Sequence, residues 1–136
     1  MKKENWATDF LTNLAKIYAD DVEILEIIED TIDVYGEYVA YVYKMESLRP
    51  ILKIKLGKDE YKNAVEEMDE KRTRIHNAAI ASTKIINRLC ESNRIPLFFE
   101  ANIEDRVEVA EFIRDVVVNV FENRKHIKSN FIKISK

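Results

Sequence analysis

Glycine, proline and cysteine are scarce in this chain of 136 residues. It holds two glycines and two prolines, whereas β-sandwiches and β-barrels need many such residues for their tight turns. This scarcity argues against an all-β fold and favours long, uninterrupted helices. The single cysteine, Cys90, cannot form an intramolecular disulfide, and no second thiol is present for a zinc ribbon or a CxxC redox motif. We therefore expect a reducing compartment, the cytoplasm.

Long apolar runs are also missing. No stretch approaches the ~20 apolar residues that a membrane-spanning helix needs, and no apolar core of signal-peptide length follows Lys2 and Lys3. We expect neither a signal peptide nor a membrane partner. The chain does have 46% hydrophobic and 35% charged residues, which suffice for one core and a solvated surface. We expect a single domain over residues 1–136, with residues 126–136 as a flexible basic tail.

Apolar side chains recur at helical spacing along four segments. We expect a short helix over residues 6–19, a helix of about seven turns from Val22, a third over residues 59–92 and a fourth that starts at Asn102 as N-cap. The spacing predicts an all-α fold, an antiparallel bundle of three long helices with the short N-terminal helix packed across it. The apolar side of the second helix consists of Leu25, Ile28, Ile32, Tyr35, Val39, Val42 and Tyr43.

Two short stretches depart from the helical period. Pro50 disfavours helical geometry at Arg49, and the apolar residues of 52–56 alternate with lysines at the period of a strand. We interpret residues 49–58 as a connector. Residues 131–134 alternate in the same way. The two stretches either pair as a small ribbon or each form a helical turn.

The loop over residues 93–101 is unusually apolar, since it contains Leu97, Phe98 and Phe99. Such a loop is expected to fold back over an open end of the bundle or to be covered by a partner. The chain also has six tyrosines, six phenylalanines and one tryptophan. This aromatic surplus favours a homodimer formed through a helix face, or another protein partner.

Charge is divided unevenly along the chain, whose net charge is −3. Residues 20–48 hold nine acids and one lysine, whereas residues 49–58 and 125–136 each hold four lysines or arginines and no acid. The acidic side of the second helix either binds a basic partner, as a mimic of nucleic acid does, or is a solvated face balanced by nearby lysines. Direct binding of nucleic acid is not expected. The acidic face consists of Glu23, Glu26, Asp30, Asp33 and Glu37.

Polar residues interrupt the apolar side of the third helix. Arg72 and His76 lie one turn apart, and Asn87 falls within reach of the same side. Glu46 lies on the expected buried side of the second helix, where a carboxylate needs a partner. This cluster either binds an anion, forms an acid-base pair, or is a satisfied polar network that fixes helix register, with the arginine stacked on a tyrosine.

Catalytic and metal-binding signatures are not found in the sequence. Neither His76 nor His126 has a glutamate three positions earlier, as di-metal sites of helical bundles require. Cys90 continues the apolar side of its helix and is expected to behave as a small hydrophobe. The two glycines are too far apart for a phosphate-binding loop. We predict no metal, no cofactor and no catalytic residue.

Residues 72–89, with His76-Asn77 and Asn87-Arg88-Leu89, are followed by Asp105-Arg106 and the helix over residues 109–124. This pattern resembles an uncharacterised family of small bacterial helical proteins, over about the C-terminal half of the chain. The resemblance implies an all-helical fold. It brings no assigned activity, and it therefore implies no functional residue.

Three functions remain open at this point. The first is a non-enzymatic interaction or regulatory module that acts through helix-face contacts. The second is an acidic inhibitor or nucleic-acid mimic that binds a basic partner through the acidic face. The third is a small anion or small-molecule site, or an enzyme, at the cluster of Arg72, His76, Glu46 and Asn87.

Overall fold

The structure is a computed structural model, which describes residues 5–122 apart from the side chains of residues 121 and 122. This part of the chain forms four α-helices and no strand, which confirms the all-α prediction. The helices are α1 (Trp6–Ile17), α2 (Val22–Lys55), α3 (Lys58–Ser92) and α4 (Arg106–Glu122). None of these helices has both the length and the apolar character needed to cross a bilayer. The expected tail at 126–136 and the alternating stretch at 131–134 lie outside the described residues.

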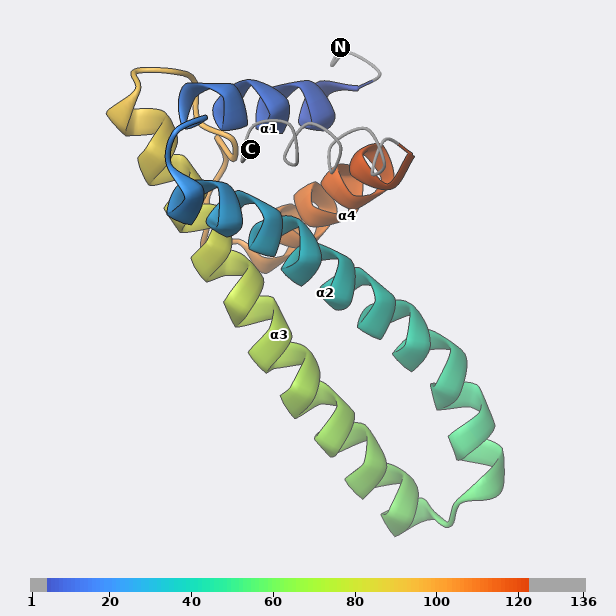
Figure 1. Ribbon diagram of the computed structural model, residues 1–136. Helices are drawn as coiled ribbons and strands as arrows, with labels where there is room; N and C mark the ends of the chain where they lie inside the picture. Colours follow the sequence, from blue (N-terminus) through green and yellow to red (C-terminus); the bar gives the residue numbers. More distant parts are fainter. Residues whose placement is uncertain (1–4, 123–136) are drawn as a thin grey trace.

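The two longest helices, α2 and α3, form an antiparallel hairpin (Figure 1). At the open end of this hairpin, α4 packs on α2, and α1 packs on both α4 and α2. The far half of the hairpin extends away from α1 and α4 (Figure 1). The core therefore lies at the open end, where all four helices contribute side chains. Its fully buried members include Leu11, Leu14, Ile28, Tyr35, Ile86, Val109, Ile113 and Val116.

The connector expected at residues 49–58 is wrong, because α2 continues through Pro50 to Lys55. The proline is exposed, so its ring faces no neighbouring helix, and it removes one backbone hydrogen bond without ending α2. Leu52 and Leu56 are four residues apart and half-buried, whereas Ile54 between them is 86% exposed. The alternation that looked like a strand therefore includes two leucines at helical spacing, which lie on the same side of the chain.

Inward positions of α2 follow a heptad pattern where it packs on α3. Tyr38 and Met45 are buried seven residues apart, and Leu52 follows after another seven. Such a repeat keeps one seam of a helix against its partner over many turns. Across the same hairpin, Nη2 of Arg49 donates a hydrogen bond to Oδ1 of Asp69 at 2.9 Å. This pairing joins the two helices near the closed end.

The first turn of α4 starts later than predicted. Asp105 is its N-cap, because its Oδ1 accepts hydrogen bonds from the backbone N–H groups of Val107 at 3.0 Å and Glu108 at 3.2 Å. Asn102, the predicted cap, instead accepts from the N–H of Glu104 at 3.0 Å in a short turn before the helix. Asn and Asp favour both turns and helix caps, and the sequence alone did not separate the two roles.

The apolar loop between α3 and α4 folds back onto the bundle, as expected. Phe98 is buried, and its ring centroid lies 4.8 Å from that of Phe10 and 5.0 Å from that of Phe112. The side chain of Asn87 holds the next residue, Phe99. Its Nδ2 donates to the Phe99 carbonyl at 3.0 Å, and its Oδ1 accepts from the Phe99 N–H at 3.1 Å. Asn87 therefore anchors this loop.

Candidate functional site

A cleft of about 330 Å³ opens between α2, α3 and α4. Three arginines and a histidine line it, together with an apolar surface. We refer to it as the arginine cleft. Its lining residues are Tyr38 of α2, Arg72, Thr73 and His76 of α3, and Arg106, Val107, Ala110, Glu111 and Arg114 of α4.

The imidazole of His76 is 4% exposed, and its ring centroid lies 5.3 Å from that of Tyr38. Its Nε2 atom is buried and has no hydrogen-bond partner among the described residues. A buried polar atom left in this way costs about 1–3 kcal/mol. Burial lowers the pKa of His76, and the positive charges of Arg106 and Arg72 lower it further. The ring is therefore neutral at pH 7, and its Nε2 is left without a partner among the described residues.

Two of the three arginines are free to turn towards a ligand. Arg106 forms no ion pair with any residue in the described range. Arg72 lies 3.8 Å from Asp69, measured between Nη2 and Oδ1, whereas the same carboxylate is 2.9 Å from Arg49. The stronger partner of Asp69 is thus Arg49, which leaves Arg72 loosely held. Exposed pairs of this length contribute at most about 1 kcal/mol.

The third arginine, Arg114, contacts two residues of α2. Its Nη2 lies 3.5 Å from Oε1 of Glu46, and its guanidinium carbon lies 6.0 Å from the ring centroid of Tyr43. Glu111 is the one carboxylate among the lining residues of the cleft. The lining therefore carries three positive charges and one negative charge. This arrangement attracts anions.

A family model described as "Protein of unknown function (DUF3232)" matches residues 1–126. The chain belongs to the DUF3232 family. The match spans all four helices, so it extends the resemblance seen from the sequence well beyond the C-terminal half and confirms that the family is uncharacterised. No curated protein and no solved structure matches the chain. Because DUF3232 brings no activity, function has to be argued from the surface of the molecule.

The structure brings only two of the four residues of the predicted polar cluster into the cleft of this DUF3232 chain, Arg72 and His76. Glu46 is not on the buried side of α2, since its side chain is 61% exposed. Met45 occupies the buried position instead, because the inward positions follow the heptad seam that α3 requires. Asn87 anchors the apolar loop through Phe99 and does not line the cleft.

The sequence interpretation missed Arg106 and Arg114. Each lies four residues from Ala110, so the three share one side of α4. This spacing was a usable signal, but an arginine on the polar side of an amphipathic helix is normally solvated. Only the fold, which brings this side of α4 to the same cleft as Arg72 and His76, shows that both arginines line it.

Two other features of the DUF3232 chain offer little for chemistry. Cys90 is buried, and burial raises the pKa of its thiol, so the reactive thiolate is disfavoured. Within the described residues, no group of three His, Cys, Asp or Glu side chains is placed to hold a metal ion.

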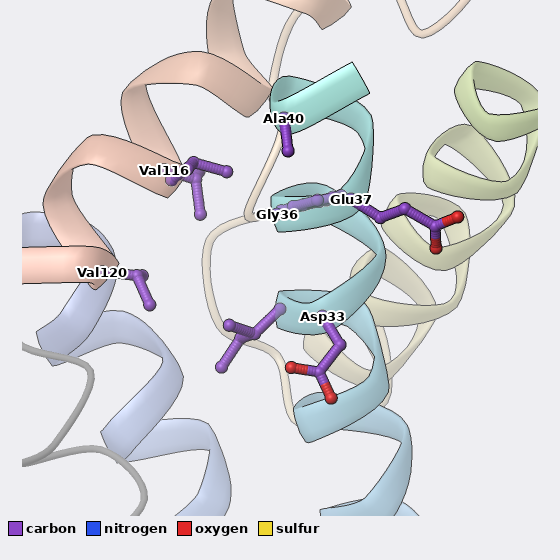
Figure 2. Close-up of a pocket in the computed structure, with 9 residues that line it drawn as sticks. Asp33, Gly36, Glu37, Ala40, Val116 and Val120 are labelled. Carbon is purple, nitrogen blue, oxygen red and sulfur yellow. The ribbon is translucent and has the colours of Figure 1, made fainter. Parts of the chain in front are cut away.

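The five residues of the acidic face, predicted from the sequence as a partner surface, are all exposed along α2. Of these, Glu23, Glu26, Asp30 and Glu37 form no ion pair with a described residue. A second hollow of about 250 Å³ lies at the end of this face, between α2 and α4. Figure 2 shows Gly36, Ala40, Val116 and Val120 around it, with Asp33 beside it, whereas the side chain of Glu37 extends away from Val116 and Val120. We refer to it as the α2–α4 groove.

The apolar loop contributes less free surface than its sequence suggested. Phe98 and Phe99 are buried by the chain itself, and Leu97 is half-buried. A shallow groove of about 500 Å³ runs beside the loop, between α1 and α4. Binding of a partner at Leu97, Phe98 and Phe99 stays a prediction.

Proposed function

We propose that this protein binds a small molecule through an oxyanion group, a phosphate or a carboxylate, held in the arginine cleft. The observation that carries the proposal is the unpartnered Nε2 of His76, buried in a cleft that three arginines line. Guanidinium groups bind both kinds of oxyanion through paired, charge-assisted hydrogen bonds. The volume of the cleft, about 330 Å³, suits a small ligand.

The lining offers both charged groups and an apolar surface to a ligand. The arginines supply positive charge, and the neutral imidazole of His76 can donate one hydrogen bond from Nε2 at no cost in charge. Tyr38, Val107 and Ala110 offer an apolar wall for the rest of the ligand. A ligand with one or two negative charges and a small apolar body fits this combination.

The sequence also allowed a structural interpretation, in which the polar cluster only fixes the register of the helices. A network of that kind satisfies its buried polar atoms. The buried Nε2 of His76 has no such partner among the described side chains, and Arg72, one helical turn before it, is only loosely paired. These two facts favour a ligand site over a structural network.

Thermal unfolding with and without phosphate or acetate, at matched ionic strength, tests the proposal. An anion at ten times its Kd stabilises the native state by about 1.4 kcal/mol, which raises the Tm of a domain of this size by roughly 4–6 °C. Arg106→Gln should remove this rise without lowering the Tm in chloride, because Arg106 is exposed. Arg88→Gln, an exposed arginine outside the cleft, is the matched control. Equal rises in both variants, or none in the wild type, would refute the proposal.

A second candidate function, binding of a basic protein through the acidic face, is supported by four exposed carboxylates that have no ion-pair partner among the described residues. Lysine substitutions at Glu23, Glu26 and Asp30 should abolish capture of such a protein. Lysine substitutions at Glu66, Glu67 and Glu70, exposed on α3, change the net charge equally and should preserve it. Capture that survives the first set of changes counts against this function.

A further inference from the structure

The far half of α2 exposes large apolar side chains on one side. Ile54 is 86% exposed and Ile51 is 47% exposed, and Tyr43, about three turns before Ile54, is 54% exposed. A contiguous exposed apolar surface on a soluble helix marks a binding surface. Ile51 and Ile54 lie on the part of the hairpin that extends away from α1 and α4 (Figure 1), whereas the ring of Tyr43 lies beside Arg114 of α4.

This surface has the spacing of a coiled-coil seam. Its positions alternate by four and three residues, as the a and d positions of a heptad do. The seam starts at the α2–α4 groove and ends at the closed end of the hairpin. It consists of Gly36, Ala40, Tyr43, Ser47, Pro50 and Ile54, all exposed except the half-buried Gly36. We refer to it as the outer seam.

The two ends of the outer seam differ in side-chain size. Its first half contains Gly36 and Ala40, and the absence of a side chain at Gly36 leaves the floor of the α2–α4 groove open (Figure 2). Its last residue, Ile54, is the most exposed large apolar side chain in the described part of the chain. The groove therefore has room for an apolar side chain of the kind that the other end of the same seam presents.

We propose that the occupant of the groove is a second copy of this chain, packed antiparallel along the outer seam. In this register Gly36 faces Ile54 of the other copy, Ala40 faces Pro50, and Tyr43 faces Ser47. Residues 36 and 54 are about 27 Å apart along the helix, at ~1.5 Å per residue. Because a two-fold axis near residue 45 repeats every contact, both grooves are filled at once, and the assembly closes as a dimer.

Charge supports the antiparallel direction. Asp33 and Glu37 belong to the turns of α2 that line the groove, whereas residues 49–58 at the closed end contain Lys53, Lys55 and Lys58 and no acid. Antiparallel packing brings the acidic end of each α2 to the basic end of the other. Parallel packing would place like charges together, which costs free energy.

A different occupant of the groove is the chain's own segment 123–136, which follows α4 and contains four lysines. That segment would account for the groove alone. It would leave Ile51 and Ile54 uncovered at the far end of α2. A second copy accounts for both surfaces with one contact, and it is therefore the occupant that the structure favours.

Light scattering behind size exclusion, on the full chain, measures the oligomeric state. We expect a dimer for the wild type and a monomer for Ile54→Glu. Val118→Glu, which changes a 57% exposed apolar residue on α4 outside the seam, should remain a dimer. A monomeric wild type, or a dimer that Ile54→Glu leaves intact, would overturn the proposal, and the first result would point to segment 123–136 as the occupant.

Cross-linking with a short bismaleimide tests the direction of packing. Mixed chains that carry Gly36→Cys and Ile54→Cys should form a covalent dimer, whereas either variant alone should not. The wild type is the control, because its single thiol, Cys90, is buried. Efficient cross-linking of Ile54→Cys to itself would show parallel packing and contradict the proposal.

Discussion

The ring of Tyr38 on α2 packs 5.3 Å from the ring of His76 on α3, at an angle of 53°. This contact places the imidazole between an aromatic ring of one helix and the arginines of the cleft. Arg72 on α3 and both Arg106 and Arg114 on α4 line the same space, and Glu111 is the carboxylate among them. His76 thus lies where its protonated form is disfavoured both by burial and by positive charge.

The first prediction concerns the pH dependence of stability. The pKa of His76 is below its ordinary value of 6.5 in the native state, so the unfolded chain binds a proton that the native chain does not. The neutral form of His76 contributes stability that is fully present above pH 6.5, and this contribution is lost as the pH falls through the lowered pKa of His76 in the native state. We expect the Tm to drop between pH 7.5 and pH 5 by more in the wild type than in His76→Gln. Thermal unfolding followed by circular dichroism measures both drops.

The difference between the two proteins isolates His76, because every other titrating group is common to both. Phosphate should reduce the drop in the wild type, since a bound anion offsets the charges of the arginines and favours the protonated ring. If wild type and His76→Gln lose stability in parallel, the histidine is not held neutral by its surroundings.

The second prediction concerns a buried hydrogen bond between α2 and α3. The hydroxyl of Tyr35 donates to Oγ1 of Thr83, which itself donates to the Ala79 carbonyl at 2.8 Å. Burial raises the pKa of Tyr35 well above its ordinary value, so this group stays a donor. Tyr35→Phe should lower the free energy of unfolding by about 1 kcal/mol, measured by urea titration. Tyr41→Phe, at a half-buried ring, should change it far less.

The third prediction concerns the start of α1, which a residue of α4 caps. Oδ1 of Asn119 accepts hydrogen bonds from the backbone N–H groups of Ala7 and Thr8, each at 3.1 Å, whereas Asn5 at the N-cap position makes no side-chain capping bond. Asn119→Ala should cost about 1–3 kcal/mol of stability, because it leaves buried amides without an acceptor. Urea titration against Asn13→Ala, an exposed residue of the same helix, provides the comparison. Equal stability of the two variants would show that the cap is unimportant.

The helices were largely predictable from the sequence because each one buries an apolar side at a period near 3.6 residues. The exception was the end of α2, where Pro50 and the alternation of Leu52, Ile54 and Leu56 imitated a connector. Leu52 and Leu56 are half-buried in the hairpin, and α2 continues despite the hydrogen bond lost at the proline. The local sequence around Pro50 favours a connector, whereas burial in the folded hairpin, which the local sequence does not reveal, keeps the segment helical.

The candidate site was predictable only in part. Arg72 and His76 were found because they interrupt an apolar side of one helix. Arg106 and Arg114 were not, because their side of α4 looks solvated until the position of α3 is known. Glu46 was misplaced by one residue, since α2 follows a repeat of 3.5 residues along the hairpin and not 3.6.

The most direct test of the arginine cleft is a phosphate titration followed through the ring protons of His76 by NMR, at constant ionic strength. The signals of His76 should shift with saturation, and its pKa should rise towards 6.5 in the presence of phosphate. Arg106→Gln should weaken the shift of His76. If phosphate leaves His76 unmoved, or shifts it equally in the wild type and in Arg106→Gln, the cleft does not bind oxyanions and the proposed function is wrong.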